Sequence, residues 1–269
     1  MRLLPAAILL FSGSAWAQSP PPSTCNATQI LSVDNFAAGG PANSLGGIAR
    51  ISWCDFEFPA PTTQLTSVLV HGRPAFITLQ QTEPTSPVTS VILHGYPSYV
   101  PRQIVVQLPN LMATTDSASL ELLRGAQTVA STSVQIQEFA PGIFTMDGTP
   151  NGPAVAWSSP MNYIVQGNPA RPGQVVTLFC EGLGPTFPFV PAGSVPSGMA
   201  ISTTFPQIYV GNQLAPVILS RLSSSSGTPS AAGVYEVSFV VPALSSGNQP
   251  IYLTIGGQTS NAATLAVTQ

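Results

Sequence analysis

The side chains that could perform catalysis or hold a metal are few and widely spaced in this sequence. Its two histidines, His71 and His94, have no second histidine, cysteine or carboxylate at the spacing of a zinc motif such as His-Glu-x-x-His. Asp55 and Glu57 are placed to share one face of a strand, where paired carboxylates could serve glycoside hydrolysis. Their aromatic and proline neighbours favour an exposed edge or strand end instead. We therefore predict no catalytic residue, no metal site and no cofactor.

A hydrolase with an unfamiliar site is the enzymatic alternative. It would require His71 or His94 within hydrogen-bond reach of a serine and a carboxylate. The sequence contains no Gly-x-Ser-x-Gly motif, which marks the nucleophile of α/β-hydrolases. The non-enzymatic interpretation is therefore preferred.

Four aromatic residues in proline-rich, loop-like surroundings are candidates for contact with a ligand: Trp157, Tyr163, Phe187 and Phe189. Such rings can stack on a sugar or anchor a protein partner. The alternative is that they cap the end of a domain or fill a seam between domains. Glycan binding, as an accessory to polysaccharide degradation, would require two or three of these rings to be coplanar and exposed. Burial of Trp157 and Tyr163 would argue against it.

Composition indicates a packed protein without long helices. The chain has 269 residues, of which 44% are hydrophobic and 6% charged, and it contains 23 Gly and 28 Pro. Disordered chains combine low hydrophobicity with high charge, which is the opposite balance. All seven basic residues are arginine and the net charge is −3, so we expect no nucleic acid partner.

The first 17 residues have the pattern of a signal peptide. One arginine precedes an apolar run, and Ala15-Trp16-Ala17 provides the small residues of a cleavage site. Residues 18–29 follow as a proline-rich segment. Outside the leader no stretch approaches 18 apolar residues, so we expect no membrane span after cleavage. The expected location is periplasmic, cell-surface or extracellular.

The rest of the chain is internally duplicated. Four segments recur in the same order at offsets that drift by a few residues, as loop insertions between fixed strands would produce. The aligned pairs are 47–55 with 173–181, 69–75 with 209–215, 103–109 with 236–242, and 125–128 with 256–259.

The repeated segments have the pattern of β-strands. Large apolar residues occupy every second position, as in Tyr235, Val237 and Phe239. Turn-forming clusters separate the runs at the spacing expected of a sandwich of short antiparallel strands. We predict an all-β protein of two tandem immunoglobulin-like β-sandwiches, covering residues 30–139 and 140–269.

The duplication guides the interpretation of the three cysteines. Cys54 and Cys180 align, so they should lie in different domains, too far apart for a disulfide. Cys25 has no counterpart and could bond to Cys54, leaving Cys180 as a buried thiol. The alternative is three thiols. The aligned Trp53 and Phe179 are both expected in a core.

The second half resembles an uncharacterised C-terminal domain found in secreted proteins of Acidobacteria, especially Solibacter. The resemblance rests on residues 140–145 (APGIFT), 152–155 (GPAV), 168–176 (NPARPGQVV), 180–186 (CEGLGPT), 233–237 (GVYEV) and 255–261 (IGGQTSN). It implies an immunoglobulin-like or IPT-like sandwich and no known activity. Residues 30–139 resemble the half that often precedes this domain, although Val105 stands where Asn is usual.

We conclude from the sequence that the protein is a secreted or cell-surface, non-enzymatic interaction or adhesion module. Its partner would be an unidentified protein or glycan surface. Most of the glycines and prolines of the resemblance are explained by turns.

Overall fold

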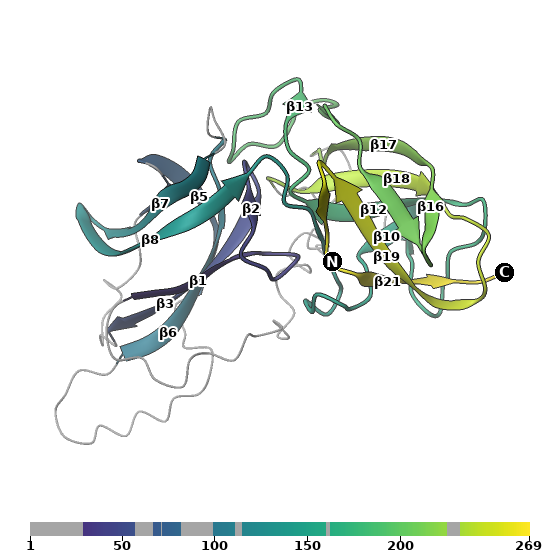
Figure 1. Ribbon diagram of the computed structural model, residues 1–269, viewed down its shortest axis with the longest axis horizontal. Coiled ribbons are helices and arrows are strands. Elements are labelled where there is room, and N and C mark those ends of the chain that lie inside the picture. Colours follow the sequence, from purple (N-terminus) through teal and green to yellow (C-terminus); the bar gives the residue numbers. More distant parts are fainter. Residues whose placement is uncertain are drawn as a thin grey trace, which may run out of the picture.

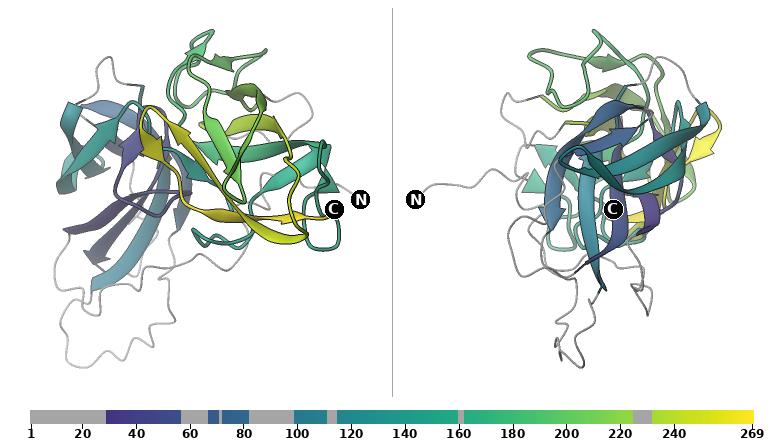
Figure 2. Two further views of the ribbon diagram at one scale, coloured as in Figure 1. Left: turned by 45° about the vertical axis from the view of Figure 1, so that its right-hand side comes forward. Right: turned by 90° about the vertical axis from the view of Figure 1, so that its left-hand side faces the viewer.

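The computed structural model describes residues 29–56, 67–70, 72–81, 99–110, 115–159, 162–224 and 232–269. These residues form strands, turns and irregular segments and contain no helix. Two β-sandwiches follow each other along the long axis (Figure 1), and in an end-on view one lies in front of the other (Figure 2). The predicted signal peptide, 1–17, lies outside the described residues, as does almost all of the segment 18–29.

The first sandwich has the strand order of an immunoglobulin domain. One sheet has the order β1-β3-β6-β5, and the other contains β4-β7-β8, with β2 parallel to β8. β5 belongs to both sheets, because its first residues pair with β4 and its later residues with β6. The strands are β1 (Gln29–Asn35), β2 (Asn43–Ser44), β3 (Ile48–Phe56), β4 (Ser67–Val70), β5 (Arg73–Gln81), β6 (Tyr99–Gln107), β7 (Thr115–Arg124) and β8 (Gln127–Gln137).

The second sandwich repeats this order. One sheet contains β10-β12-β18-β17, and the other contains β15-β19-β21. The all-β, tandem immunoglobulin-like prediction is therefore confirmed. The strands are β9 (Gly142–Ile143), β10 (Ala156–Ser159), β11 (Asn162–Tyr163), β12 (Val175–Glu181), β13 (Thr186–Phe187), β14 (Ile201–Ser202), β15 (Gln207–Val210), β16 (Gln213–Ala215), β17 (Val217–Leu222), β18 (Tyr235–Val240), β19 (Gly247–Ile255), β20 (Gln258–Thr259) and β21 (Ala263–Val267).

Three of the four aligned segments keep their register in the structure. The hairpin β4–β5 corresponds to β15–β16, and β6 corresponds to β18, with inward-facing apolar residues at the aligned positions. The turn after β7 and the turn after β19 both place a glycine at positive φ, Gly125 at 63° and Gly256 at 56°. The repeat in the sequence therefore reflects a repeat of strands.

In the remaining aligned pair, 47–55 with 173–181, the structure shifts the equivalent residues by one position relative to the sequence alignment. The alignment predicts that Trp53 and Phe179 are equivalent and both face a core. Trp53 does lie in the first core, but on β12 it is Cys180 that faces the second core, while Phe179 faces the first sandwich. Successive residues of a strand face opposite sides, so a slip of one residue exchanges the two faces.

A third apolar cluster joins the sandwiches, and we call it the seam. It combines residues of β3 and β6 with residues of the second sandwich, so each domain completes the burial of the other. Its buried members are Ile48, Val105, Phe144, Val155, Trp157, Phe179 and Val234, with Phe36, Ala37 and Tyr163 packed against them.

Glycines of the second sandwich let the linker between the two sandwiches, residues 138–141, pass close to its backbone. Gly182 has φ +74° and its carbonyl accepts a hydrogen bond from the Ala140 N–H at 3.0 Å. A Cβ at Gly182 would lie 1.9 Å from the Ala140 carbonyl oxygen. The ring of Phe139 fits between Gly184 and Gly256, where added Cβ atoms would come within 2.5 and 2.2 Å. These glycines of the family-like motif thus serve the approach of the linker.

In the described part of the chain, no helix has the length and apolarity needed to cross a membrane.

Replacing Gly182 should destabilise the protein more than replacing a glycine of similar φ in open space. Gly257 has φ +78° with no atom within 4 Å of an added Cβ, so Gly257→Ala tests the backbone strain alone. We expect that variant to lose about 1–2 kcal/mol of unfolding free energy. Gly182→Ala should lose roughly 1–3 kcal/mol more, because its methyl group collides with backbone. Urea denaturation measures both, and equal losses would contradict the proposed packing.

Candidate interaction surface and domain seam

The structure separates the four predicted ligand-facing aromatic residues into two pairs. Trp157 is 4% exposed and Tyr163 is partly buried. The Trp157 ring packs edge-on against Phe179 at 4.7 Å and lies 5.9 Å from the Tyr163 ring. The prediction that Trp157 faces a ligand is therefore wrong, because its indole fills the seam.

Phe187 and Phe189 lie on the surface and are 78% and 63% exposed. They belong to residues 185–206, which connect β12 to β15 and which we call the excursion. The excursion includes the short strands β13 and β14. The exposure of Phe187 and Phe189 is compatible with contact with a ligand, but that contact stays a prediction.

The excursion concentrates the exposed apolar side chains of the protein. Of the eleven large hydrophobic side chains that are exposed in the described part of the chain, six lie in these 22 residues. Isolated exposed apolar residues are normal, whereas a concentration indicates an interaction site. The six are Phe187, Phe189, Val195, Met199, Ile201 and Phe205.

The excursion carries no side chain that could be charged. Residues 185–206 contain no Asp, Glu, Arg, Lys or His, and no Asn or Gln, but five prolines. The nearest charged pair in the sheet is Arg221 and Glu236, whose nitrogen and oxygen atoms lie 2.8 Å apart. Ser223 donates a further hydrogen bond to Glu236 at 2.8 Å. The charges beside the excursion therefore satisfy each other.

Hydrogen bonds fix the excursion to both sandwiches. The Gly193 N–H donates to Oε1 of Gln107 in the first sandwich at 2.6 Å. Ser202 and Ser220 share a buried hydrogen bond of 2.7 Å, and the Thr203 N–H donates to the Pro185 carbonyl at 3.0 Å. Prolines and these bonds restrict the backbone, so the exposed rings are presented on a fixed support.

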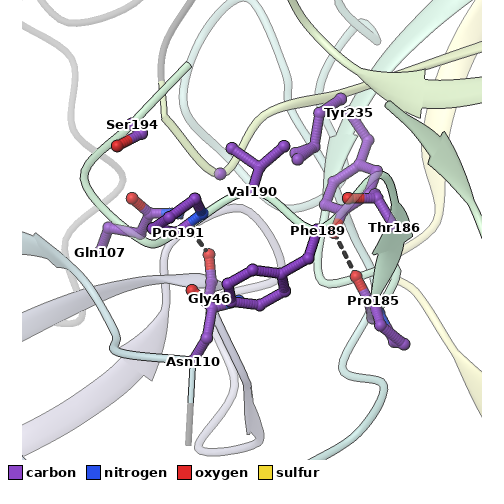
Figure 3. Close-up of a pocket in the computed structure, with 13 residues that line it drawn as sticks. Gly46, Gln107, Asn110, Pro185, Thr186, Phe189, Val190, Pro191, Ser194 and Tyr235 are labelled. Carbon is purple, nitrogen blue, oxygen red and sulfur yellow. Dashed lines mark hydrogen bonds between the residues drawn. The ribbon is translucent and has the colours of Figure 1, made fainter. Parts of the chain in front are cut away.

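A small recess separates the excursion from the first sandwich. Figure 3 shows Phe189 and Pro191 opposite Gly46 and Gln107, whose side-chain nitrogen donates to the Gly46 carbonyl at 2.9 Å. The recess has a volume of about 20 Å³. That is room for one water-sized molecule and excludes an organic ligand.

A wider hollow lies at the hairpin ends of the second sandwich. It is a shallow depression of about 510 Å³, largely open to solvent, and its lining includes the neutral side chains of Gln213, Ser245, Gln249 and Gln269. We call it the amide hollow. Its amides can both donate and accept hydrogen bonds, and its open shape suits a ligand that stays partly in water.

Two tyrosines on neighbouring strands were not identified from the sequence. Tyr209 on β15 pairs with Tyr252 on β19, and their rings are parallel to within 12° with centroids 5.1 Å apart. At that separation the rings cover one face of each other. The pair therefore does not offer a sugar the broad surface of two rings lying side by side.

The seam contains a fully buried carboxyl group, that of Glu181. Its Oε1 accepts a hydrogen bond from the Ala37 N–H at 2.6 Å, and its Oε2 accepts one from the Ile48 N–H at 2.7 Å. Burial raises the pKa of Glu181 to about 8, although these two N–H donors and the nearby Arg50 oppose the shift. Arg50 also lies over the Phe36 ring, 5.2 Å from its centroid. Glu181 therefore connects the second sandwich to two backbone positions of the first.

Sequence reasoning did not single out Glu181. A carboxylate at the end of an alternating strand is ordinarily expected to face water. The only signal was its position in the glycine-rich segment that resembles the secreted family, which we attributed to turns.

The remaining predicted residues have mixed outcomes. Cys180 is a buried free thiol, as expected, and burial raises its pKa. Cys54 is buried and disulfide-bonded. Cys25 lies outside the described residues, so the pairing of Cys25 with Cys54 stays a prediction. His71, His94 and Glu57 also lie outside them, and the hydrolase alternative is untested. No cluster of three or more His, Cys, Asp or Glu occurs in the part that is described.

No family model and no curated protein matches the sequence, so the resemblance to the Acidobacteria domain stays a prediction. Solved structures similar to this chain include the surface glycan-binding protein PbSGBP-B of Prevotella bryantii, at 12% identity and a TM-score of 0.25. That match covers 89% of this chain and 42% of the other. The SGBP-B protein of the Bacteroides ovatus mixed-linkage glucan utilization locus matches at 12% and 0.30, covering 93% and 47%.

The N-terminal Ig1-2 module of the Drosophila receptor protein tyrosine phosphatase DLAR is also similar. It is 12% identical with a TM-score of 0.21, and the match covers 91% of this chain and 100% of that module. This chain thus spans less than half the length of the two glycan-binding proteins. With TM-scores of 0.30 or less, these matches assign no function to it.

The buried carboxyl of Glu181 predicts a pH-dependent stability. Below about pH 4.5, its ordinary pKa, the group is neutral in the folded and the unfolded chain. As the pH rises toward about 8 only the unfolded chain ionises readily, so the free energy of unfolding should fall. We expect a loss of a few kcal/mol, since each pKa unit corresponds to about 1.4 kcal/mol.

Urea denaturation at a series of pH values measures this effect. Glu181→Gln should remove most of the decrease between pH 4.5 and 8. Glu121→Gln is the matched control, because the Glu121 carboxylate accepts an exposed hydrogen bond from the Thr128 hydroxyl and is not fully buried. A pH profile that Glu181→Gln leaves unchanged would show that another group controls it.

Proposed function

We propose that this protein is an exported, non-enzymatic module that binds another protein through the excursion. Export is inferred from the leader pattern of residues 1–17. The observation that carries the proposal is the exposure of Phe187 and Phe189 on an uncharged, proline-rich segment. Aromatic residues, phenylalanine included, are enriched at the centres of protein interfaces.

The chemistry of the excursion favours a protein over a glycan. Sugars present many hydroxyl groups, which need precisely placed polar partners in a binding site. The side chains of residues 185–206 offer only serine and threonine hydroxyls for this purpose. Their exposed apolar groups instead match the apolar centre of a protein interface.

The excursion can be tested by binding to the cell that produces the protein. A fluorescently labelled chain from residue 18 onward should bind intact cells or their envelopes saturably, with competition by unlabelled protein. Phe187→Ser combined with Phe189→Ser should weaken this binding at least about tenfold, as expected for loss of two anchors at roughly 1 kcal/mol or more each.

Leu214→Ser is the matched control for this experiment. Leu214 is also exposed, at 57%, but it lies on β16 outside the excursion. Its replacement should leave binding unchanged. Both variants should keep the wild-type urea midpoint, because all three replaced side chains are mostly exposed. Full binding by the double variant would refute the role of the excursion.

Glycan binding is a second candidate, and the amide hollow is the observation that favours it. Its neutral amides suit uncharged sugar hydroxyls, and its volume of about 510 Å³ is large enough for a short oligosaccharide. This candidate does not depend on Trp157 or Tyr163, whose packing in the seam removes the original basis for a glycan site.

Titration calorimetry with neutral oligosaccharides tests this candidate. Gln213→Ala should weaken binding by about tenfold or less, as expected for loss of one or two hydrogen bonds to a neutral partner. Gln207→Ala is the control, because Gln207 lies on the neighbouring strand and accepts a hydrogen bond from Tyr209. Binding that is absent, or equally affected by both changes, would exclude the hollow.

A further inference from the structure

We propose that a second copy of this chain docks on the excursion to form a symmetric dimer. This inference rests on the proposed function of the excursion as a protein-binding surface. In a dimer with two-fold symmetry the same patch is used by both copies, so the patch must fit itself chemically.

Charge is the first argument for a second copy. The chain has a net charge of −3, which on average repels another copy. A charged patch would bring like charges together across a two-fold axis, but residues 185–206 have none. Arg221 and Glu236, the charges nearest in the sheet, are already paired with each other. The excursion is therefore a surface where two copies meet without like-charge repulsion.

Continuity with the seam is the second argument. Paired residues run across one face of the sheet, from Phe179 through Glu236 and Arg221 to Ile201 and Phe187. At the Phe179 end this face is covered by the apolar residues of the first sandwich. At the Phe187 end it is open, with side chains of the same apolar kind. The same sheet face thus packs against the first sandwich at its Phe179 end and is exposed to solvent at its Phe187 end.

The available area is the third argument. An aromatic side chain offers about 150–250 Å², so Phe187 and Phe189 together leave roughly 200–350 Å² of apolar surface in water. Val195, Met199 and Phe205 add exposed apolar surface in the same segment. A standard interface buries about 800 Å² per partner with a polar rim. The apolar side chains fit its centre, and the serine and threonine hydroxyls of the excursion fit its rim.

Contact would be made by side chains and not by extension of the sheet. β13 is the outermost strand of its sheet, but it has two residues. Pro185 and Pro188 flank it, and neither has an N–H to donate to a neighbouring strand. This arrangement prevents open-ended strand pairing and leaves the rings of Phe187 and Phe189 for a closed contact.

Sedimentation equilibrium of the chain from residue 18 onward tests the dimer, over about 1 to 200 µM, the range of moderate affinities. The wild type should show a reversible monomer–dimer equilibrium. The double variant Phe187→Ser, Phe189→Ser should raise the dissociation constant at least about tenfold. Leu214→Ser should leave it unchanged. Because the patch carries no charge, raising the salt from about 0.05 to 0.5 M should not weaken the dimer.

Two outcomes would overturn the dimer. One is a wild type that stays monomeric over the whole range, and the other is a dimer that the double variant does not weaken. These outcomes are distinct from failure of the proposed function. A monomeric wild type whose binding to cells is lost in the double variant would leave the excursion as a binding surface for a different protein.

Discussion

The arrangement of the two sandwiches depends on how a buried carboxyl group is satisfied at their seam. Removing such a group from water is unfavourable unless hydrogen bonds replace its hydration. Here the Ala37 and Ile48 N–H groups donate to the two oxygens of Glu181 from the opposite domain. Apolar packing alone has little directional preference, whereas these bonds are satisfied in one relative position of the domains. The seam therefore determines how the two sandwiches are oriented relative to each other, in addition to burying apolar surface between them.

That orientation also determines where the excursion lies. Its Gly193 N–H bonds to Gln107, which in turn bonds to the Gly46 carbonyl, so a residue of the first sandwich supports a loop of the second. If the domains moved apart, the loop would lose this support while keeping its bonds to Ser220 within its own sandwich. The position of the exposed phenylalanines thus depends on both sandwiches, although the chain segment that carries them is part of the second.

The fold was predictable because it depends on patterns that repeat along the chain. Alternation of apolar residues in β6, β18 and β19 identified strands with one buried face, and glycine-rich turns marked their ends. The register of β12 was missed by one residue because the last residues of the strand are buried on both faces, one in the core and one in the seam. Phe179 interrupts the alternation that Val176, Thr177 and Leu178 show.

The site was harder to predict, because exposure of an aromatic ring depends on which other domain covers it. Trp157 and Phe187 stand in similar proline-rich surroundings, yet one packs on Phe179 and the other reaches solvent. Local sequence cannot distinguish them, since the deciding contacts come from Ile48 and Val105, which lie in the other sandwich and far from Trp157 in the chain. Composition alone does not single out the excursion, because residues 237–269 form a longer segment that also carries no charge. What distinguishes the excursion is that folding within one chain leaves its phenylalanines exposed to water.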